Sequence, residues 1–202
     1  MHPNKSFAWN NREEMLQFVS ERAFAHIFVA SGDARAVVHA PILVIDRDRV
    51  QFHVFRNNRG APLLPNSSVL ASVTALDGYQ SANWYVSSNQ VPTWHYQAVE
   101  IDGTARKLAE PELIEQLDRL SAVMEDRFSP DAPWTRAKMD PGKFEAMIKA
   151  LDGFEVSIDA IRGTLKFNQH KSAADMEANV KGQNEAGRAD VAAAIARHWS
   201  GQ

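Results

Sequence analysis

Asp77-Gly-Tyr-Gln-Ser-Ala-Asn-Trp-Tyr-Val-Ser-Ser-Asn-Gln-Val-Pro-Thr-Trp-His-Tyr-Gln-Ala-Val-Glu-Ile-Asp-Gly103 is the stretch around which the fold is organised. It holds all 3 tyrosines of the chain and two of its 5 tryptophans, interleaved with serine, asparagine and threonine. Aromatic planes beside short hydrogen-bonding side chains suit a flat ligand with polar edges. They equally suit a barrel or sandwich core in which Tyr and Trp satisfy one another through their polar tips. The residues alone leave both interpretations open.

Short β-rich segments lie on both sides of this stretch. They cover residues 26–31, 36–46, 50–55, 69–76 and 96–108. Because a parallel return needs a crossover of about a dozen residues, the short connections between the early segments predict antiparallel hairpins. Gly103 predicts a bulge or bend within its strand. A last core strand over 154–158 is expected to turn at Arg162-Gly163 into a further strand over 164–167.

Apolar residues at steps of three and four predict helices around these strands. The expected helices run from an Asn11 cap to 22, from Pro111 to 128, from Pro141 to Leu151 with Gly153 as the end, and in two segments after Ser172. The sum is a mainly β, α+β fold of six or seven antiparallel strands curled into a barrel, with helices outside. We expect one domain over 1–171 and a C-terminal helical extension over 172–202 that packs on it.

Composition excludes several classes of protein. The 202-residue chain has no cysteine, so a disulfide framework, a thiolate metal site and a cysteine nucleophile are excluded. The net charge of −3 argues against broad attachment to nucleic acid. The N-terminus has no apolar signal region and no run approaches the roughly 18 apolar residues of a membrane span, so a soluble cytoplasmic protein is expected.

Common nucleotide, hydrolase and metal motifs are missing. Gly-x-Gly-x-x-Gly, Gly-x-x-x-x-Gly-Lys, Gly-x-Ser-x-Gly and His-Glu-x-x-His do not occur, and the 7 histidines are scattered, which predicts no metal site. Two histidines, His39 and His53, lie within apolar strands, where an unpaired imidazole costs a few kcal/mol. Each is either a core histidine bonded to backbone or part of a binding site.

Several motifs together resemble the PaiB-like family. They are His39-x-Pro41, His53-x-x-Arg56-x-Asn58, Tyr79-x-Ser81-x-x-Trp84-Tyr85, Val91-Pro-Thr-Trp94-His-Tyr96 and Lys166-Phe-Asn-Gln169, in the family's order and rough spacing. Members are called FMN-binding negative transcriptional regulators and belong to the flavin split-barrel group typified by pyridoxamine phosphate oxidase. The resemblance runs from the first helix to the Lys-Gln segment.

The resemblance implies a homodimer with FMN between the two barrels. It implies phosphate contacts from Arg56 and Asn58, consistent with bidentate guanidinium bonds to phosphate. It further implies flavin or subunit contacts from aromatic residues and approach of a cation or amide to the flavin N1/O2 edge. The aromatic residues are Trp84, Tyr85, Trp94 and Tyr96, the cation and amide are Lys166 and Gln169, and Ser81, His39 and His53 complete the predicted cofactor site.

The sequence departs from the family at several positions. Ala82 and Asn83 stand where the family commonly has Pro and Ser, Arg59 stands for a Pro, and His95 stands for an Asn. Three functions stay open: an FMN-binding negative regulator, a flavin oxidoreductase on a small molecule, and a flavin-free binding module. No DNA-reading element is recognisable, so regulation would act through flavin state, a partner or a metabolite. For an oxidoreductase, His39, His53 and His95 are the candidate proton donors.

Overall fold

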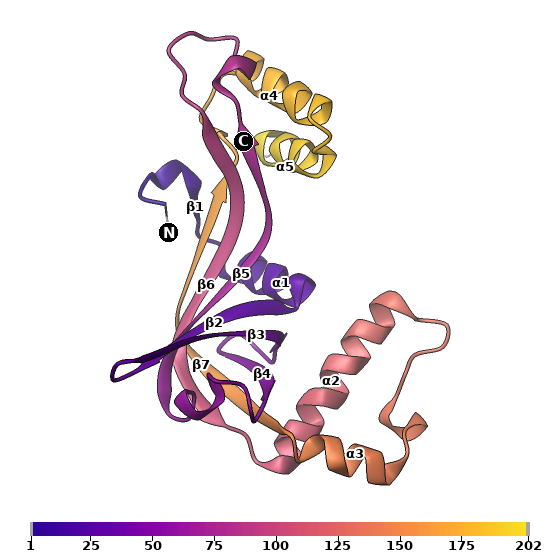
Figure 1. Cartoon of the computed structure of the whole chain (residues 1–202). Coiled ribbons are helices and arrows are strands. Elements are labelled where there is room, and N and C mark those ends of the chain that lie inside the picture. Colours follow the sequence, from indigo (N-terminus) through magenta and orange to yellow (C-terminus); the bar gives the residue numbers. More distant parts are fainter. Residues whose placement is uncertain (1, 201–202) are drawn as a thin grey trace. The chain divides into compact units, whose positions relative to one another are not determined.

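A computed structural model describes residues 2–200 of the chain. Its sheet consists of β1 (Ala8–Trp9), β2 (Phe24–Ser31), β3 (Ala34–Val44), β4 (Arg49–Phe55), β5 (Ser67–Gln80), β6 (Thr93–Lys107) and β7 (Leu151–Lys166) (Figure 1). The α-helices are α1 (Arg12–Arg22), α2 (Glu110–Phe128), α3 (Pro141–Ile148), α4 (Ala173–Glu185) and α5 (Ala189–Ser200). Short 3-10 turns are η1 (Lys5–Phe7), η2 (Ala61–Leu63), η3 (Ala82–Trp84) and η4 (Arg136–Lys138).

The strands form an antiparallel barrel. Their order in the sheet is β1-β7-β4-β3-β2-β5-β6, and an additional pairing of β7 with β6 closes the six strands other than β1 into a ring. The registered pairs are antiparallel, from Phe24 opposite Pro41 on β2 and β3 to Phe55 opposite Leu151 on β4 and β7. The predicted α+β fold, a mainly β barrel with peripheral helices, is confirmed.

Every second side chain along the strands points into the barrel and fills it. On β2, Ala25, Ile27 and Val29 are buried while the residues between them are more exposed, as expected for strands with one face on the core. Gly103 lies within a continuous β6, where an added Cβ would collide with the backbone oxygen of Ser157 on β7. Its missing side chain lets these two strands approach closely.

Helix α1 covers part of the sheet. Its buried residues are Met15, Leu16, Phe18 and Val19, and it packs on β3. The apolar stripe of this helix therefore lies on the sheet that follows it in the chain.

Two boundaries predicted from the sequence are wrong. Helix α3 starts on the predicted Asp140 cap, which accepts from Lys143 N, but it ends at Ile148. Leu151 already belongs to β7. Gly153 lies within that strand, and a glycine fits there because an added Cβ would crowd Leu108 and Leu113.

The turn predicted at Arg162-Gly163 is also absent from the described chain. Gly163 pairs with Trp9 of β1, so β7 runs unbroken from Leu151 to Lys166. Both errors have one cause, since glycines that lie within a continuous strand were interpreted as chain breaks.

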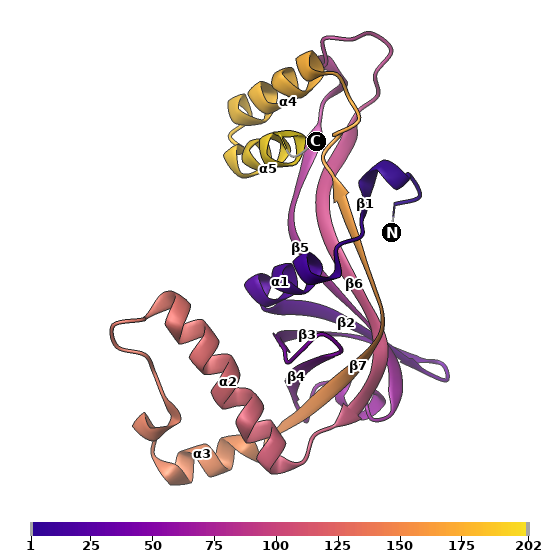
Figure 2. The same cartoon turned by 180° about the vertical axis from the view of Figure 1, so that it is seen from behind.

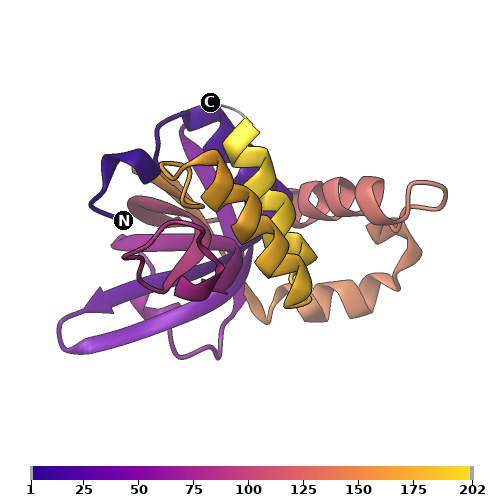
Figure 3. The same cartoon turned by 90° about the horizontal axis from the view of Figure 1, so that it is seen from above.

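The chain divides into two compact units. Unit 1 comprises the residues up to Asn11, Thr74–Val99 and the residues from Arg162 onward; unit 2 comprises Arg12–Val73 and Glu100–Ile161. In unit 1, α4 and α5 lie side by side (Figure 3) over a core that includes Phe167. In unit 2, a long connection carrying η4 joins α2 to α3 (Figure 2). The domain boundary at residue 172 stays a prediction, although the two helices expected beyond it are present.

Candidate functional site

A pocket in unit 2 gathers three of the predicted site residues. It measures about 400 Å³ and is lined by His39 on β3, His53 on β4 and Asn58 in the turn after β4. This volume lies in the usual range for small-molecule sites. The other walls are mostly apolar or aromatic, and they come from β4, α2, the loop after α2, α3 and the start of β7: Phe55, Leu117, Trp134, Met139, Phe144, Met147, Ile148 and Leu151.

His53 is held in one orientation by a buried glutamine. Its Nδ1 lies 3.2 Å from Oε1 of Gln116, a fully buried residue of α2. Because an amide oxygen only accepts, Nδ1 carries the proton, and the neutral ring keeps its lone pair on Nε2. Burial lowers the pKa of His53, while the bond to Gln116 opposes that shift. His53 therefore offers one hydrogen-bond acceptor to a ligand in this pocket.

His39 is paired with a second histidine. Its Nδ1 lies 2.7 Å from Nδ1 of His26, the residue opposite it on β2. Only one of the two nitrogens can donate in such a contact, so one proton lies between the rings. Neither alternative from the sequence described this arrangement, because a partner on the neighbouring strand depends on register.

Asn58 and Arg56 belong to the turn that follows β4. Asn58 Oδ1 accepts from Gly60 N at 2.9 Å, which leaves its amide hydrogens to donate. Arg56 does not line the pocket that contains His39, His53 and Asn58. Its Nε donates to Asp152 Oδ1 at 2.9 Å and to Leu151 O at 3.0 Å. Lys107 also contacts that carboxylate oxygen, at 2.9 Å. The predicted phosphate role of Arg56 stays a prediction.

The predicted aromatic residues lie in unit 1. Trp84 packs so closely on α4 that a Cβ at Gly182 would meet its ring. Tyr85 OH accepts from Asn168 Nδ2 at 2.6 Å, and Ser81 Oγ accepts from Asn83 N at 3.2 Å. Each of these side chains thus has a partner inside the unit.

Lys166 and Gln169 also have partners inside unit 1. Lys166 Nζ donates to Thr93 Oγ1 at 2.6 Å and lies 5.9 Å from the ring centroid of Tyr96. Burial lowers the pKa of Lys166. Gln169 Nε2 donates to Ser6 O and Leu165 O, and its Oε1 accepts from the backbone of residue 167. A flavin contact by Gln169 would have to replace one of these bonds.

Trp94 is the most exposed of the predicted aromatic residues. Its side chain is 53% exposed and meets the 49% exposed Tyr79 edge to face, with ring centroids 5.9 Å apart. An exposed aromatic pair of this kind leaves a face open to a partner.

A buried polar network in unit 1 was not predicted from the sequence. Gln80 donates to Asn179 Oδ1 at 2.6 Å, and its own Oε1 accepts from His95 Nε2 at 2.9 Å. Gln183 Nε2 donates to the backbone oxygen of Tyr79 at 2.8 Å. The available signal was the four-residue spacing of Asp175, Asn179 and Gln183, which puts three polar side chains on one face of α4.

Two titratable residues of this region, His95 and Asp175, have pKa values that the protein lowers. Burial lowers the pKa of His95 to about 4, so His95 is neutral near pH 7 and is no proton donor there; that prediction is wrong. Asp175 accepts from Val86 N, Ser87 N and Ser87 Oγ at 2.7 to 2.9 Å, which fixes the loop that follows Tyr85. These bonds, that from the Ser87 backbone first, lower the pKa of Asp175.

Comparison with known proteins finds a matching family and a related protein. A family model described as "Putative FMN-binding domain" matches residues 1–160. The chain is 28% identical over 181 residues to "Protease synthase and sporulation protein PAI 2" of Bacillus subtilis (strain 168), covering 87% of this chain and 85% of that protein.

Solved structures share the fold at low identity. A flavocytochrome, Anf3 from Azotobacter vinelandii, superposes with a TM-score of 0.60 at 16% identity over 82% of this chain and 72% of that one. An FAD- and haem-binding protein from Mycobacterium smegmatis gives a TM-score of 0.59 at 18% identity over 79% of this chain and 73% of that one.

No helix among residues 2–200 is long and apolar enough to cross a membrane.

Proposed function

The chain belongs to the FMN-binding domain family, and we propose that it is a flavoprotein that holds FMN in the pocket of unit 2 and acts in negative regulation of gene expression. The observation that carries the proposal is the convergence of His39, His53 and Asn58 on that pocket. These residues come from separate motifs, and an apolar pocket with a few convergent polar groups is typical of a cofactor site.

The residues around the pocket fit a flavin. Trp134, Phe144 and Met147 supply flat or adaptable apolar walls for a ring system. His53 Nε2 can accept a hydrogen bond from the ring edge, and the Asn58 amide can donate to an anionic oxygen. Bound FMN would supply electron and hydride transfer, while the protein orients it and limits water access.

An absorbance spectrum of the purified protein is the first test of the cofactor. We expect a flavin band, or its appearance after FMN is added and excess ligand removed. A protein that neither carries nor takes up flavin would contradict the proposal and favour the flavin-free binding module.

The phosphate role of Arg56 has its own test. Arg56→Ala should lower the affinity for FMN by about tenfold and the affinity for riboflavin far less, because a guanidinium contributes charge-assisted bonds to phosphate. Arg59→Ala, three residues along the same turn, is the matched control. Equal losses for the two flavins would remove Arg56 from the phosphate site.

We further propose that the protein is a homodimer with the flavin near the subunit interface. Large hydrophobic side chains on β2 support this proposal, since Phe24 and Phe28 are 48% and 44% exposed. A two-fold partner would cover such surface. Light scattering at decreasing protein concentration measures the oligomeric state, and a monomer at every concentration would contradict the proposed dimer.

The regulatory role rests on the likeness to PAI 2, a protein named for protease synthesis and sporulation. Because the chain is acidic overall and has no recognisable DNA-reading element, we expect regulation through flavin state, a partner or a metabolite. Gel-shift assays with oxidised, reduced and flavin-free protein test this. Tight, salt-sensitive, sequence-specific binding by the dimer alone would overturn it.

A flavin oxidoreductase is the second candidate, favoured by the orientation of His53. With Nδ1 bound to Gln116, Nε2 is the atom that could hold or release a proton beside a ligand. Anaerobic mixing of the flavin-loaded protein with NADH or NADPH discriminates. Rapid bleaching supports the enzyme, and its absence at millimolar nucleotide argues for the regulator.

A further inference from the structure

Two histidine side chains on the outer face of the barrel converge on one point. His26 of β2 and His39 of β3 lie directly opposite each other in the antiparallel register. Their Nδ1 atoms are 2.7 Å apart, and the two ring planes are nearly perpendicular, at 82°. Neither side chain makes another hydrogen bond or an ion pair with residues 2–200. The pair therefore presents two nitrogen atoms to one place, with no competing partner for either.

One proton lies between these nitrogens, and a metal ion can take its position. A neutral imidazole can carry its proton on either nitrogen, so both rings can hold it on Nε2 and stay uncharged. Both Nδ1 atoms then have free lone pairs, and neutral imidazole nitrogen is a common protein ligand of transition metals. His39 is exposed and His26 is partly exposed, so a hydrated ion can reach the pair.

The distance between the two nitrogens favours one coordination geometry. With metal–nitrogen bonds of about 2.0 Å, two ligands at a right angle have nitrogens about 2.8 Å apart, and two ligands at the tetrahedral angle have them about 3.3 Å apart. The observed 2.7 Å is close to the first value. Tetragonal sites with nitrogen ligands are typical of Cu²⁺ and Ni²⁺, whereas Zn²⁺ prefers tetrahedral sites.

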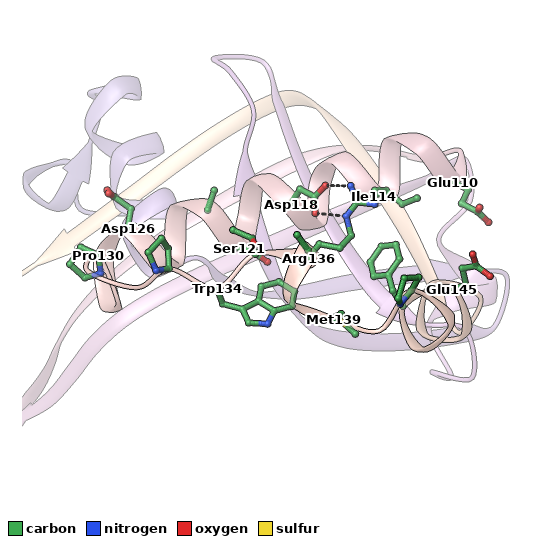
Figure 4. A pocket seen from close by; sticks show the side chains of 16 residues that line it. Glu110, Ile114, Asp118, Ser121, Asp126, Pro130, Trp134, Arg136, Met139 and Glu145 are labelled. Carbon is green, nitrogen blue, oxygen red and sulfur yellow. Dashed lines mark hydrogen bonds and ion pairs between the residues drawn. The ribbon is translucent and has the colours of Figure 1, made fainter.

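The carboxylates of unit 2 do not converge in this way. A pocket of about 970 Å³ between α2, the connection after it and α3 is lined by Glu110, Asp126 and Glu145. Glu110 and Glu145 lie at one end of this pocket and Asp126 at the other (Figure 4). In the same pocket, Asp118 accepts from Arg136 at 2.9 and 3.1 Å. In the part of the chain that the structure describes, no group of three or more histidines and carboxylates is placed to hold a metal ion.

We propose that His26 and His39 form a two-histidine site for a tetragonal divalent metal ion, with Cu²⁺ preferred because imidazole sites bind it most tightly among the first-row divalent ions. The two Nδ1 atoms are neighbouring ligands, and water or the same pair of a second copy of the chain fills the positions opposite them.

The metal site is distinct from the proposed flavin pocket, although His39 lines that pocket as well. His26 does not line it, and the metal uses the His39 nitrogen that faces β2. The inference goes beyond the proposed function and needs no flavin, so it is tested on flavin-free protein.

Calorimetric titration of the flavin-free, full-length protein with Cu²⁺ tests the proposal. Every protein in the series carries His2→Ala, because an amino-terminal amine and a histidine at position 2 can bind Cu²⁺ by themselves. We expect saturable binding at micromolar Cu²⁺ and an axial electron paramagnetic resonance signal with hyperfine splitting from ring nitrogens. One ion per chain indicates that water completes the site, and one ion per two chains indicates a site shared by two copies. No binding at millimolar Cu²⁺ would overturn the proposal.

Histidine variants locate the site. His26→Ala and His39→Ala should each lower the affinity for Cu²⁺ by about thirtyfold or more, because a single imidazole cannot chelate. His170→Ala, which removes one exposed histidine of unit 1, is the matched control and should bind as the His2→Ala parent does. Equal losses in all three variants would show adventitious binding to surface histidines, which overturns the proposal.

Two further measurements test the geometry and the folded state. The pair exists only in the folded chain, so Cu²⁺ should raise the urea midpoint of the His2→Ala parent and leave that of His26→Ala unchanged. An equal rise in both proteins would place the ion elsewhere. Ni²⁺ should bind more tightly than Zn²⁺, and tighter binding of Zn²⁺ would overturn the tetragonal site.

Discussion

Units 1 and 2 contain similar polar and aromatic residues but use them differently. In unit 2, the side chains of His53 and Asn58 each make one internal hydrogen bond, and both residues line a pocket. In unit 1, Gln169 uses both ends of its amide on the backbone, and Gln80 does the same with buried side chains. Of these four residues, the two that line the pocket therefore use less of their hydrogen-bonding capacity inside the protein than the two glutamines of unit 1.

The largest expected effect tests the claim that unit 1 polar groups are structural. His95 has a folded pKa of about 4, against about 6.5 when unfolded. The unfolded chain therefore takes up the proton first, so the contribution of His95 to the free energy of unfolding is fully present above pH 6.5 and is lost as the pH drops from 6.5 to 4, by about 3 kcal/mol. His95→Asn keeps a donor to Gln80 without this titration and should flatten that part of the profile.

Urea unfolding of wild type and His95→Asn at a series of pH values measures the difference. A residual slope is expected because burial also lowers the pKa of His53 and His170. Identical profiles for the two proteins would mean that His95 protonates as easily in the folded state as in the unfolded one.

The next effect separates structure from binding at Gln169. Gln169→Ala removes three hydrogen bonds and should lower the free energy of unfolding by about 2 kcal/mol. Flavin affinity of the folded variant should not change, in contrast to the role implied by the resemblance. Chemical unfolding and fluorescence titration with FMN check the two halves.

Gln97→Ala is the control, since the Gln97 amide on β6 makes no hydrogen bond with the described residues. We expect a change below about 0.5 kcal/mol. A loss of flavin affinity in Gln169→Ala with little loss of stability would reverse the comparison between the two units.

The sequence predicted the barrel well because its signals were local. Alternating apolar residues and short polar turns determine β2 to β4, and the Asp140 cap determines the start of α3. Gly153 misled because it allows close packing against Leu108 and Leu113, and Gly163 misled because it pairs with Trp9, a residue distant in sequence. That role cannot be told from a turn in a single sequence.

The candidate site was predicted in part for the same reason. His39, His53 and Asn58 lie in short motifs, and the barrel brings them to one pocket. The partners that decide what such residues do come from elsewhere: Gln116 for His53 and Asn179 for Gln80. Polar residues within a helix are usually solvent-facing, so Gln116 was not recognisable in advance, and the spacing of Asn179 indicated only that it shares a face of α4 with Asp175 and Gln183.

A smaller effect is expected for the unit 2 pocket. His53→Phe keeps an aromatic ring of similar size but removes the Nε2 acceptor, so FMN should bind about tenfold more weakly. Fluorescence titration measures the affinity. Gln169→Ala serves as the comparison in the same assay and should bind as the wild type does. If His53→Phe binds FMN normally, the pocket of unit 2 is not where the flavin ring lies.

The smallest effect on stability is expected at the exposed aromatic pair of unit 1. Trp94 is 53% exposed and meets only the edge of Tyr79 in this pair, so Trp94→Ala should change the free energy of unfolding of the monomer by less than about 0.5 kcal/mol. If the pair lies in a subunit interface, the same change should weaken dimerisation by about tenfold or more, because aromatic residues often dominate interface energetics. Sedimentation across a concentration series separates the two effects, and Val123→Ala, a 38% exposed residue of α2, controls for general loss of apolar surface. Unchanged dimerisation would leave unit 1 without an outward-facing role, and the division between a structural unit 1 and a binding unit 2 would then be complete.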